Sequence, residues 1–153
     1  MRDRPGASTE SVDSKRAHPT EDVHPVPGLV LVFALGQPRL GLLPFQAGQL
    51  ELVRGDGASV VPYDGKMSRR HATVCFDGQV WHVADLGSHN GTLLDGVRIS
   101  EPTSSARARV LRAGDCLFLL SADIRALRAT GVQCKDDRII GPATQAVLDQ
   151  AGR

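Results

Sequence analysis

Apolar residues fall in short runs along this chain, and turn-forming residues separate the runs. Residues 28–35 are apolar and rich in β-branched side chains, and the run ends at Gly36, which is typical of a strand buried on both faces. Residues 49–54 alternate polar and apolar side chains, the period-two pattern of a half-buried strand. Further short strands are predicted at 39–45, 59–61, 71–76, 79–84, 97–99, 109–111, 116–120 and 124–128.

Tight turns separate several of these runs. The dipeptides that mark them are Asp77-Gly78, Asn90-Gly91, Asp95-Gly96 and Gly114-Asp115. Asp-Gly between two β-prone runs favours a two-residue hairpin turn, because both residues tolerate positive φ angles. Residues 101–108 are polar and are expected to form a loop. About 10–11 short strands with turns at this spacing predict an all-β fold, an antiparallel β-sandwich over residues 27–130.

The two ends of the chain differ from its middle. Residues 1–26 are dominated by Ser, Thr, Asp, Glu, Arg and Pro. Such a segment buries too little apolar surface to offset the entropy lost on ordering, so we expect a disordered tail. Residues 131–153 are expected to form a linker and the start of a short C-terminal helix, because Pro142 suits the first turn of a helix.

Composition narrows the classes of partner and compartment. The chain has 153 residues and a formal net charge of +1, so its overall charge indicates neither nucleic acid nor a membrane surface as a direct partner. Its three cysteines form no C-x-x-C pair, which fits free thiols in a reducing cytoplasm better than disulfides or zinc. Neither a transmembrane run of about 18 apolar residues nor a signal-peptide core is present. The expected localisation is cytoplasmic.

Three polar fragments carry the candidate chemistry: Arg54, residues 68–71 (Ser-Arg-Arg-His) and residues 85–92 (Asp-Leu-Gly-Ser-His-Asn-Gly-Thr). Each lies at a predicted strand end or in a loop. Because loops gather at the two ends of a sandwich, fragments distant in sequence can share one surface. A guanidinium can grip phosphate oxygens with two parallel N–H groups, a hydroxyl can add a hydrogen bond, and an asparagine amide can pair with a peptide backbone. These groups suit a phosphoryl group carried on an extended peptide.

Each fragment taken alone has an ordinary structural interpretation. Arg54 can be a surface arginine at a strand end, and Asn90-Gly91 can be a simple hairpin turn. Asp85 has no paired carboxylate and no nucleophile–base pair beside it in sequence, so we expect no catalytic residues and no enzyme. The histidines do not show the spacing of a ligand set, and no metal or other cofactor is expected.

The order and separation of two motifs resemble the forkhead-associated (FHA) domain family over residues 28–127. The motifs are Ser-x-x-His at 68–71 and Asp-Leu-Gly-Ser-x-Asn-Gly-Thr at 85–92. The resemblance implies a β-sandwich that recognises phosphothreonine peptides in signal transduction. It implies phosphopeptide binding by Arg54, Ser68, Arg69, His89 and Asn90, and structural support of that site by His71, Gly91 and Thr92.

Within these implied roles, Arg54 and Ser68 contact the phosphate, Arg69 and His89 lie beside the phosphate or peptide, and Asn90 holds the ligand backbone. Val53 departs from the pattern, because the family usually has glycine immediately before the arginine. This departure keeps an alternative open, namely a structural or oligomerising scaffold with a weakened or lost phosphate site. The expected ligand is a phosphothreonine segment of a partner protein or of the parent protein, and the implied upstream enzyme is a bacterial Ser/Thr kinase.

Residues 139–148 are similar to the opening helix of the AAA+ ATPase domain in sigma-54-dependent transcription activators. This similarity implies that the chain is the N-terminal sensory part of such a transcription regulator, cut from a longer protein at Arg153. The chain contains no Gly-x-x-x-x-Gly-Lys-Ser/Thr phosphate-binding loop, so it is not itself the ATPase.

Overall fold

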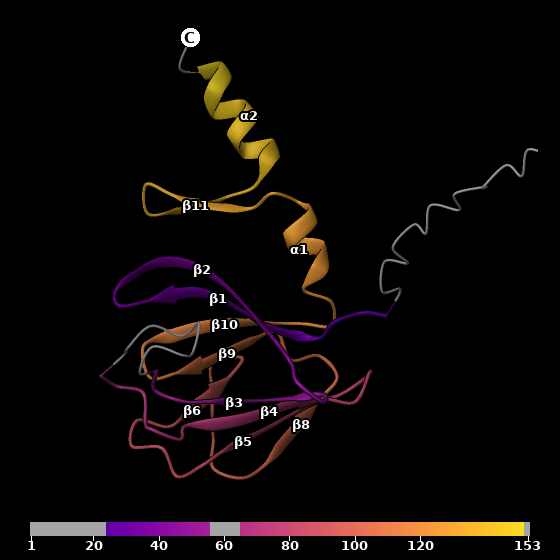
Figure 1. Cartoon of the computed structure of the whole chain (residues 1–153). Coiled ribbons are helices and arrows are strands. Elements are labelled where there is room, and N and C mark those ends of the chain that lie inside the picture. The colour runs from indigo at the N-terminus through magenta and orange to yellow at the C-terminus, as the bar shows by residue number, and fades with distance from the viewer. Residues whose placement is uncertain (1–23, 56–64, 152–153) are drawn as a thin grey trace, which may run out of the picture.

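Two antiparallel sheets packed face to face make up most of the structure, a computed structural model that describes residues 24–55 and 65–151 (Figure 1). One sheet has six strands in the order β2-β1-β10-β9-β6-β7, and the other has four in the order β3-β4-β5-β8. The strand bounds are β1 Gly28–Ala34, β2 Gln37–Pro44, β3 Gln49–Leu52, β4 Ala72–Phe76, β5 Trp81–Asp85, β6 Thr92–Leu94, β7 Val97–Ile99, β8 Thr103–Ser105, β9 Val110–Ala113 and β10 Cys116–Ser121. The predicted antiparallel, mainly β architecture is confirmed.

Most of the predicted strands are confirmed, with bounds that differ by up to two residues; they correspond to β1 to β5, β7, β9 and β10. The predicted strand at 59–61 and residues 1–23 of the predicted tail at 1–26 lie outside the described residues. The strands β6 and β8 occupy ranges in which the sequence predicts no strand. The polar residues 103–105 form the edge strand β8 beside β5, so the prediction of a loop over 101–108 is wrong for them. An edge strand pairs through its backbone on one side only, and its side chains can therefore be polar.

The Asp-Gly turn predictions have different outcomes. At Asp95-Gly96 the φ angles are 49° and 83°, and Leu94 pairs with Val97, so the two-residue turn is confirmed. At Asp77 the strands instead pair through Phe76 and Trp81, which leaves a four-residue loop over 77–80. The Asp77 carboxylate accepts hydrogen bonds from the backbone N–H groups of residues 79 and 80, at 2.9 and 2.8 Å. This local side-chain capping stabilises the longer loop.

Residues 124–128 do not form the closing strand that the sequence predicts. They lie largely in the short helix α1, Arg125–Ala129. The carboxylate of Asp123 accepts the backbone N–H of Arg125 at 3.1 Å and that of Val26 at 3.2 Å. The same carboxylate binds the Arg125 guanidinium at 2.7 Å. These bonds stabilise the turn of the chain after β10 and connect it to the segment that precedes β1.

A hairpin and a helix follow α1. The hairpin consists of β11 (Gln133–Lys135) and β12 (Arg138–Ile140), which the sequence does not indicate, and its turn residues Asp136 and Asp137 have φ angles of 47° and 57°. Helix α2 spans Pro142–Ala151, which confirms the predicted helix that begins with proline. Within the described ranges, neither helix has the length and apolarity needed to cross a membrane.

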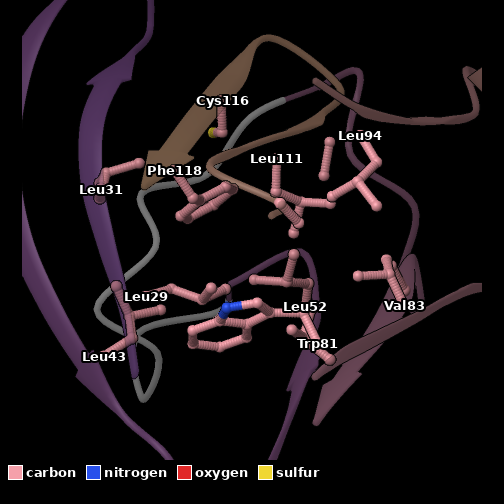
Figure 2. Packing of buried hydrophobic residues seen from close by; sticks show 14 of the residues in the cluster. Leu29, Leu31, Leu43, Leu52, Trp81, Val83, Leu94, Leu111, Cys116 and Phe118 are labelled. Atoms are coloured by element: carbon pink, nitrogen blue, oxygen red, sulfur yellow. The ribbon is translucent and has the colours of Figure 1, made fainter. Parts of the chain in front are cut away.

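The core lies between the facing sheets and is built mainly from aliphatic side chains (Figure 2). Leu29 and Phe118 from the larger sheet and Leu52 from the smaller one are each at most 1% exposed. Trp81 closes one side of the core, where its ring stacks on Phe76 with centroids 4.3 Å apart. Strand alternation separates Phe118, which is 0% exposed, from its neighbour Leu119, which is 41% exposed. The core therefore fixes the positions of the strand ends from which the site loops emerge.

We predict that Phe118→Ala lowers the free energy of unfolding by about 3–5 kcal/mol, because it removes buried apolar surface and leaves a cavity between the sheets. Urea denaturation monitored by Trp81 fluorescence measures the change. Leu119→Ala is the matched control on the same strand, and its exposed side chain should cost at most about 0.5 kcal/mol. Equal losses for the two variants would contradict this description of the core.

Candidate functional site

The three polar fragments meet at one end of the sandwich. The β3–β4 ladder continues past the ends of the strands, since His71 N–H donates to the Leu52 carbonyl at 2.9 Å and Arg54 N–H donates to the Ser68 carbonyl at 3.1 Å. The fragment at 85–92 joins the end of β5 to the start of β6 at the same edge. The structure thus places residues 54 and 68 side by side, 14 positions apart in sequence.

His71 connects these loops from below. It is fully buried, and its ring Nδ1 accepts the backbone N–H of Ser68 at 3.0 Å. Its Nε2 lies 3.1 Å from the Gly91 carbonyl oxygen. A backbone N–H can only donate and a carbonyl can only accept, so these partners assign the neutral Nε2–H tautomer. The His71 carbonyl also accepts the backbone N–H of Leu86 at 2.9 Å, and one residue therefore ties together both loops of the site.

Ser68, His89 and Asn90 lie together above this histidine. The Ser68 hydroxyl oxygen accepts the backbone N–H of His89 at 3.0 Å, which leaves its own proton to be donated to a ligand. The Asn90 amide nitrogen donates to the Lys66 carbonyl at 2.7 Å. The side chains of His89 and Asn90 are exposed, and that of Ser68 is half-buried. The structure therefore brings together the hydroxyl and the amide that the sequence analysis selected.

Asp85 braces the turn that presents Asn90. One carboxylate oxygen accepts the backbone N–H groups of Gly87 and Ser88 at 2.9 and 2.8 Å. The other accepts the hydroxyls of Ser88 and Thr92 at 2.5 and 2.6 Å. Partial burial acts to raise the pKa of Asp85, but the hydrogen bonds from Ser88 and Thr92 together outweigh it and hold the pKa below its ordinary value. Asp85 is thus a structural anion, and Thr92, which donates to it, is buried beneath the turn.

Arg98 is a residue of this end of the sandwich that the sequence analysis did not select. Its guanidinium packs on Gly91, whose φ is +77°, so closely that a Cβ at position 91 would lie 2.5 Å from it. The Arg98 Nη1 also donates to the Asn90 carbonyl at 3.3 Å. The Asp95-Gly96 turn is the sequence feature that could have indicated Arg98. This turn sets the register of β6 and β7, in which Arg98 pairs with Leu93.

Some of the positively charged side chains near the site already form salt bridges with carboxylates. The Lys66 ammonium contacts Asp115 at 2.8 Å, so the positive charge of Lys66 is partly neutralised. Arg70 binds Glu51 at 2.6 Å. Within residues 24–55 and 65–151, Arg69 is exposed and forms no ion pair. Arg54 is half-buried. An anionic ligand can therefore draw on Arg69 without breaking a salt bridge.

The histidines and cysteines of the described segments do not form a metal site. No group of three or more His, Cys, Asp or Glu side chains in those segments could hold a metal ion. His82 contacts Ser104 at 2.7 Å and Asp77 at 3.1 Å. Cys75, Cys116 and Cys134 form no disulfide.

Comparisons with known proteins agree with this geometry. The family model described as FHA domain matches residues 54–117. The protein named probable E3 ubiquitin-protein ligase dma1, from Schizosaccharomyces pombe, is 31% identical over 99 residues, which are 63% of this chain and 37% of that protein. FHA domain-containing protein FhaB from Mycobacterium tuberculosis is 43% identical over 47 residues, 31% of this chain and 30% of that protein. This chain thus spans about a third of the length of these curated relatives.

One solved structure resembles part of this chain over almost the full length of the solved domain. The FHA domain of the CT664 protein from Chlamydia trachomatis aligns with a TM-score of 0.51 and 25% sequence identity. The alignment covers 62% of this chain and 95% of that chain.

We predict that Asp85→Asn destabilises the protein at pH 7 by about 1–3 kcal/mol, because an amide cannot accept all four hydrogen bonds. The pKa of Asp85 is lower in the folded state than in the unfolded state. The carboxylate therefore stabilises the fold fully above about pH 4, and this contribution is lost as the pH falls through the lowered pKa.

Thermal unfolding between pH 7 and pH 2.5 measures this effect, and the difference in Tm between the wild type and Asp85→Asn should shrink on the acid side. Glu101→Gln, which alters an exposed carboxylate, should follow the wild-type curve. A constant difference across the whole pH range would contradict the assigned role of Asp85.

Proposed function

Because this chain contains an FHA domain, we propose that it is a phosphothreonine-peptide-binding signalling module rather than an enzyme. FHA domains belong to the modules that recognise phosphorylated motifs through arginine clusters. The proposed ligand is a phosphothreonine segment of a partner protein or of the parent protein. The residues proposed to bind it are Arg54, Ser68, Arg69, His89 and Asn90.

The observation that carries this proposal is the junction between residues 54, 68 and 89. The backbones of Arg54 and Ser68 are joined by a 3.1 Å hydrogen bond, and the Ser68 hydroxyl is joined to the backbone of His89 at 3.0 Å. A guanidinium-bearing residue, a hydroxyl with a proton to donate and an exposed amide thus share one loop cluster. A phosphate dianion offers three acceptor oxygens, and it matches this combination of donors.

The buried bonds beneath the cluster support the same proposal. The side chains of His71 and Asp85 form hydrogen bonds with backbone groups and hydroxyls of the site loops. The loops are therefore held in place before a ligand binds, which reduces the ordering cost of binding. Gly91 and Thr92 belong to the same supporting layer.

We predict that Arg54→Ala weakens binding of a phosphothreonine peptide about ten- to a hundredfold or more, because hydrogen bonds to charged groups contribute roughly 1.5–3 kcal/mol each. Ser68→Ala and Asn90→Ala should weaken it by smaller factors. Isothermal titration calorimetry with a peptide selected from a phosphothreonine library, in phosphorylated and unphosphorylated forms, measures the change.

The matched control is Arg128→Ala, which removes an exposed arginine on helix α1, at the opposite end of the six-residue strand β10 from Asp115. It should leave the affinity within about twofold, since charges more than a Debye length away are largely screened. Equal affinity of the wild type for the phosphorylated and unphosphorylated peptides would refute the proposed function.

The alternative is a structural or oligomerising scaffold whose phosphate site is weakened or lost, and Val53 is the residue that favours it. Val53 does not have a positive φ angle, so valine imposes no left-handed backbone strain there. Val53→Gly is therefore predicted to change phosphopeptide affinity by no more than about twofold in calorimetry. A large gain in affinity, from none in the wild type, would instead favour the alternative.

We also propose, as the wider context, that the module is the sensory part of a sigma-54-dependent transcription regulator in the bacterial cytoplasm. A Ser/Thr kinase would supply the phosphorylated ligand, with no direct contact between this chain and nucleic acid or membrane. Helix α2, which begins at Pro142, is the feature that supports this. Reading the gene past Arg153 tests it, and the absence of a downstream Gly-x-x-x-x-Gly-Lys-Ser/Thr loop would remove it.

A further inference from the structure

We propose that Arg98 is an additional ligand-contacting residue, which selects phosphothreonine peptides that carry an acidic side chain close to the phosphorylated residue. This inference rests on the proposed function, because it concerns the same ligand. It is carried by the position of the Arg98 guanidinium, its spare hydrogen-bond donors and the groove that begins beside it.

The position of the guanidinium is fixed by the turn that presents Asn90. The Arg98 guanidinium packs closely on Gly91: three of its atoms would lie within 2.8 Å of a Cβ at that position. It also donates to the carbonyl of Asn90 at 3.3 Å. Since Asn90 is proposed to hold the ligand backbone, a peptide bound there passes directly beside the guanidinium. Only glycine at position 91 allows this approach.

The guanidinium keeps most of its donors for a ligand. An arginine side chain has five N–H donors, and within the described ranges Arg98 uses its side chain in one hydrogen bond, to Asn90. The neighbouring cations Lys66, Arg70 and Arg112 are each paired with a carboxylate. Arg98 is exposed and forms no ion pair with any carboxylate of those ranges. A carboxylate is the acceptor that best matches the two parallel N–H groups of a guanidinium.

Arg98 also lines a groove of about 420 Å³. Its lining includes Val97 and Ile99 on β7, Glu101, and Thr103 on β8. Val97 is 69% exposed. Two carboxylates, those of Asp95 and Glu101, line the same groove. Neither forms an ion pair with Arg98, and the Asp95 carboxylate already accepts the backbone N–H groups of residues 109 and 110. The Arg98 guanidinium therefore keeps its donors for a ligand carboxylate. An extended peptide that leaves Asn90 on this side meets the guanidinium first.

The test compares peptide preferences of variants. A phosphothreonine library is selected on the wild type, and the position with the strongest Asp or Glu enrichment is identified. Two peptides are then made that differ only there, one acidic and one with the matching amide. Calorimetry with the wild type should show an about two- to fivefold preference for the acidic peptide, the range of an exposed ion pair.

Arg98→Gln should abolish this preference while phosphothreonine dependence remains. Arg128→Gln, the same change of charge on helix α1, which follows the opposite end of β10 from Asp115, should keep it. Arg98→Lys retains the charge but lacks the planar fork, so it should keep part of the preference. It also provides a folded comparison if the glutamine variant has a much lower Tm.

Two results would overturn the inference: no acidic enrichment by a wild type that binds phosphothreonine, or an unchanged acidic preference in Arg98→Gln. Failure of the proposed function is seen separately, as a wild type that binds phosphorylated and unphosphorylated libraries equally.

Discussion

The geometry of the site depends on the two hydrogen bonds of the buried His71 ring. One nitrogen accepts the N–H of Ser68, and the other donates to the carbonyl of Gly91. Neither loop has a regular ladder at these atoms, so each would otherwise bury an unpaired backbone group at a cost of about 1–3 kcal/mol. Because the ring is planar and fully buried, it also sets the spacing of the two loops. The hydroxyl of residue 68 and the amide of residue 90 are consequently held beside each other.

The polar groups that support the site loops lie deeper in the protein than the cations that could contact a ligand. The half-buried Asp85 and the buried Thr92 bond to each other, and Asp85 also bonds to backbone; these bonds stabilise the turn. The exposed cations lie above them, and several of these are already paired with carboxylates. Arg69 and Arg98 remain available for an anionic peptide in the part of the chain that the structure describes. The proposed recognition of a phosphorylated ligand then requires little rearrangement of the protein.

Sequence reasoning located most strands because period-two alternation and Asp-Gly turns are local signals. It failed where long-range contacts decide the conformation. The polar strand β8 exists because its backbone pairs with β5, and no apolar pattern marks it. The segment after β10 turns into α1 because Asp123 bonds to residues far away in sequence, including Val26. The loop at Asp77 is longer than a two-residue turn because its carboxylate bonds to two N–H groups within the loop.

The sequence by itself determined the β class and the order of most strands, and it selected a candidate residue set that includes Arg54, Ser68 and Asn90. Alternation and short motifs suffice for these, since they depend on neighbouring residues. Only the tertiary structure decided which groups meet and which charges remain unpaired. The pairing of Lys66 with Asp115 and the packing of Arg98 on Gly91 join different strands and loops, and such contacts follow from the three-dimensional arrangement of sheets rather than from any local pattern.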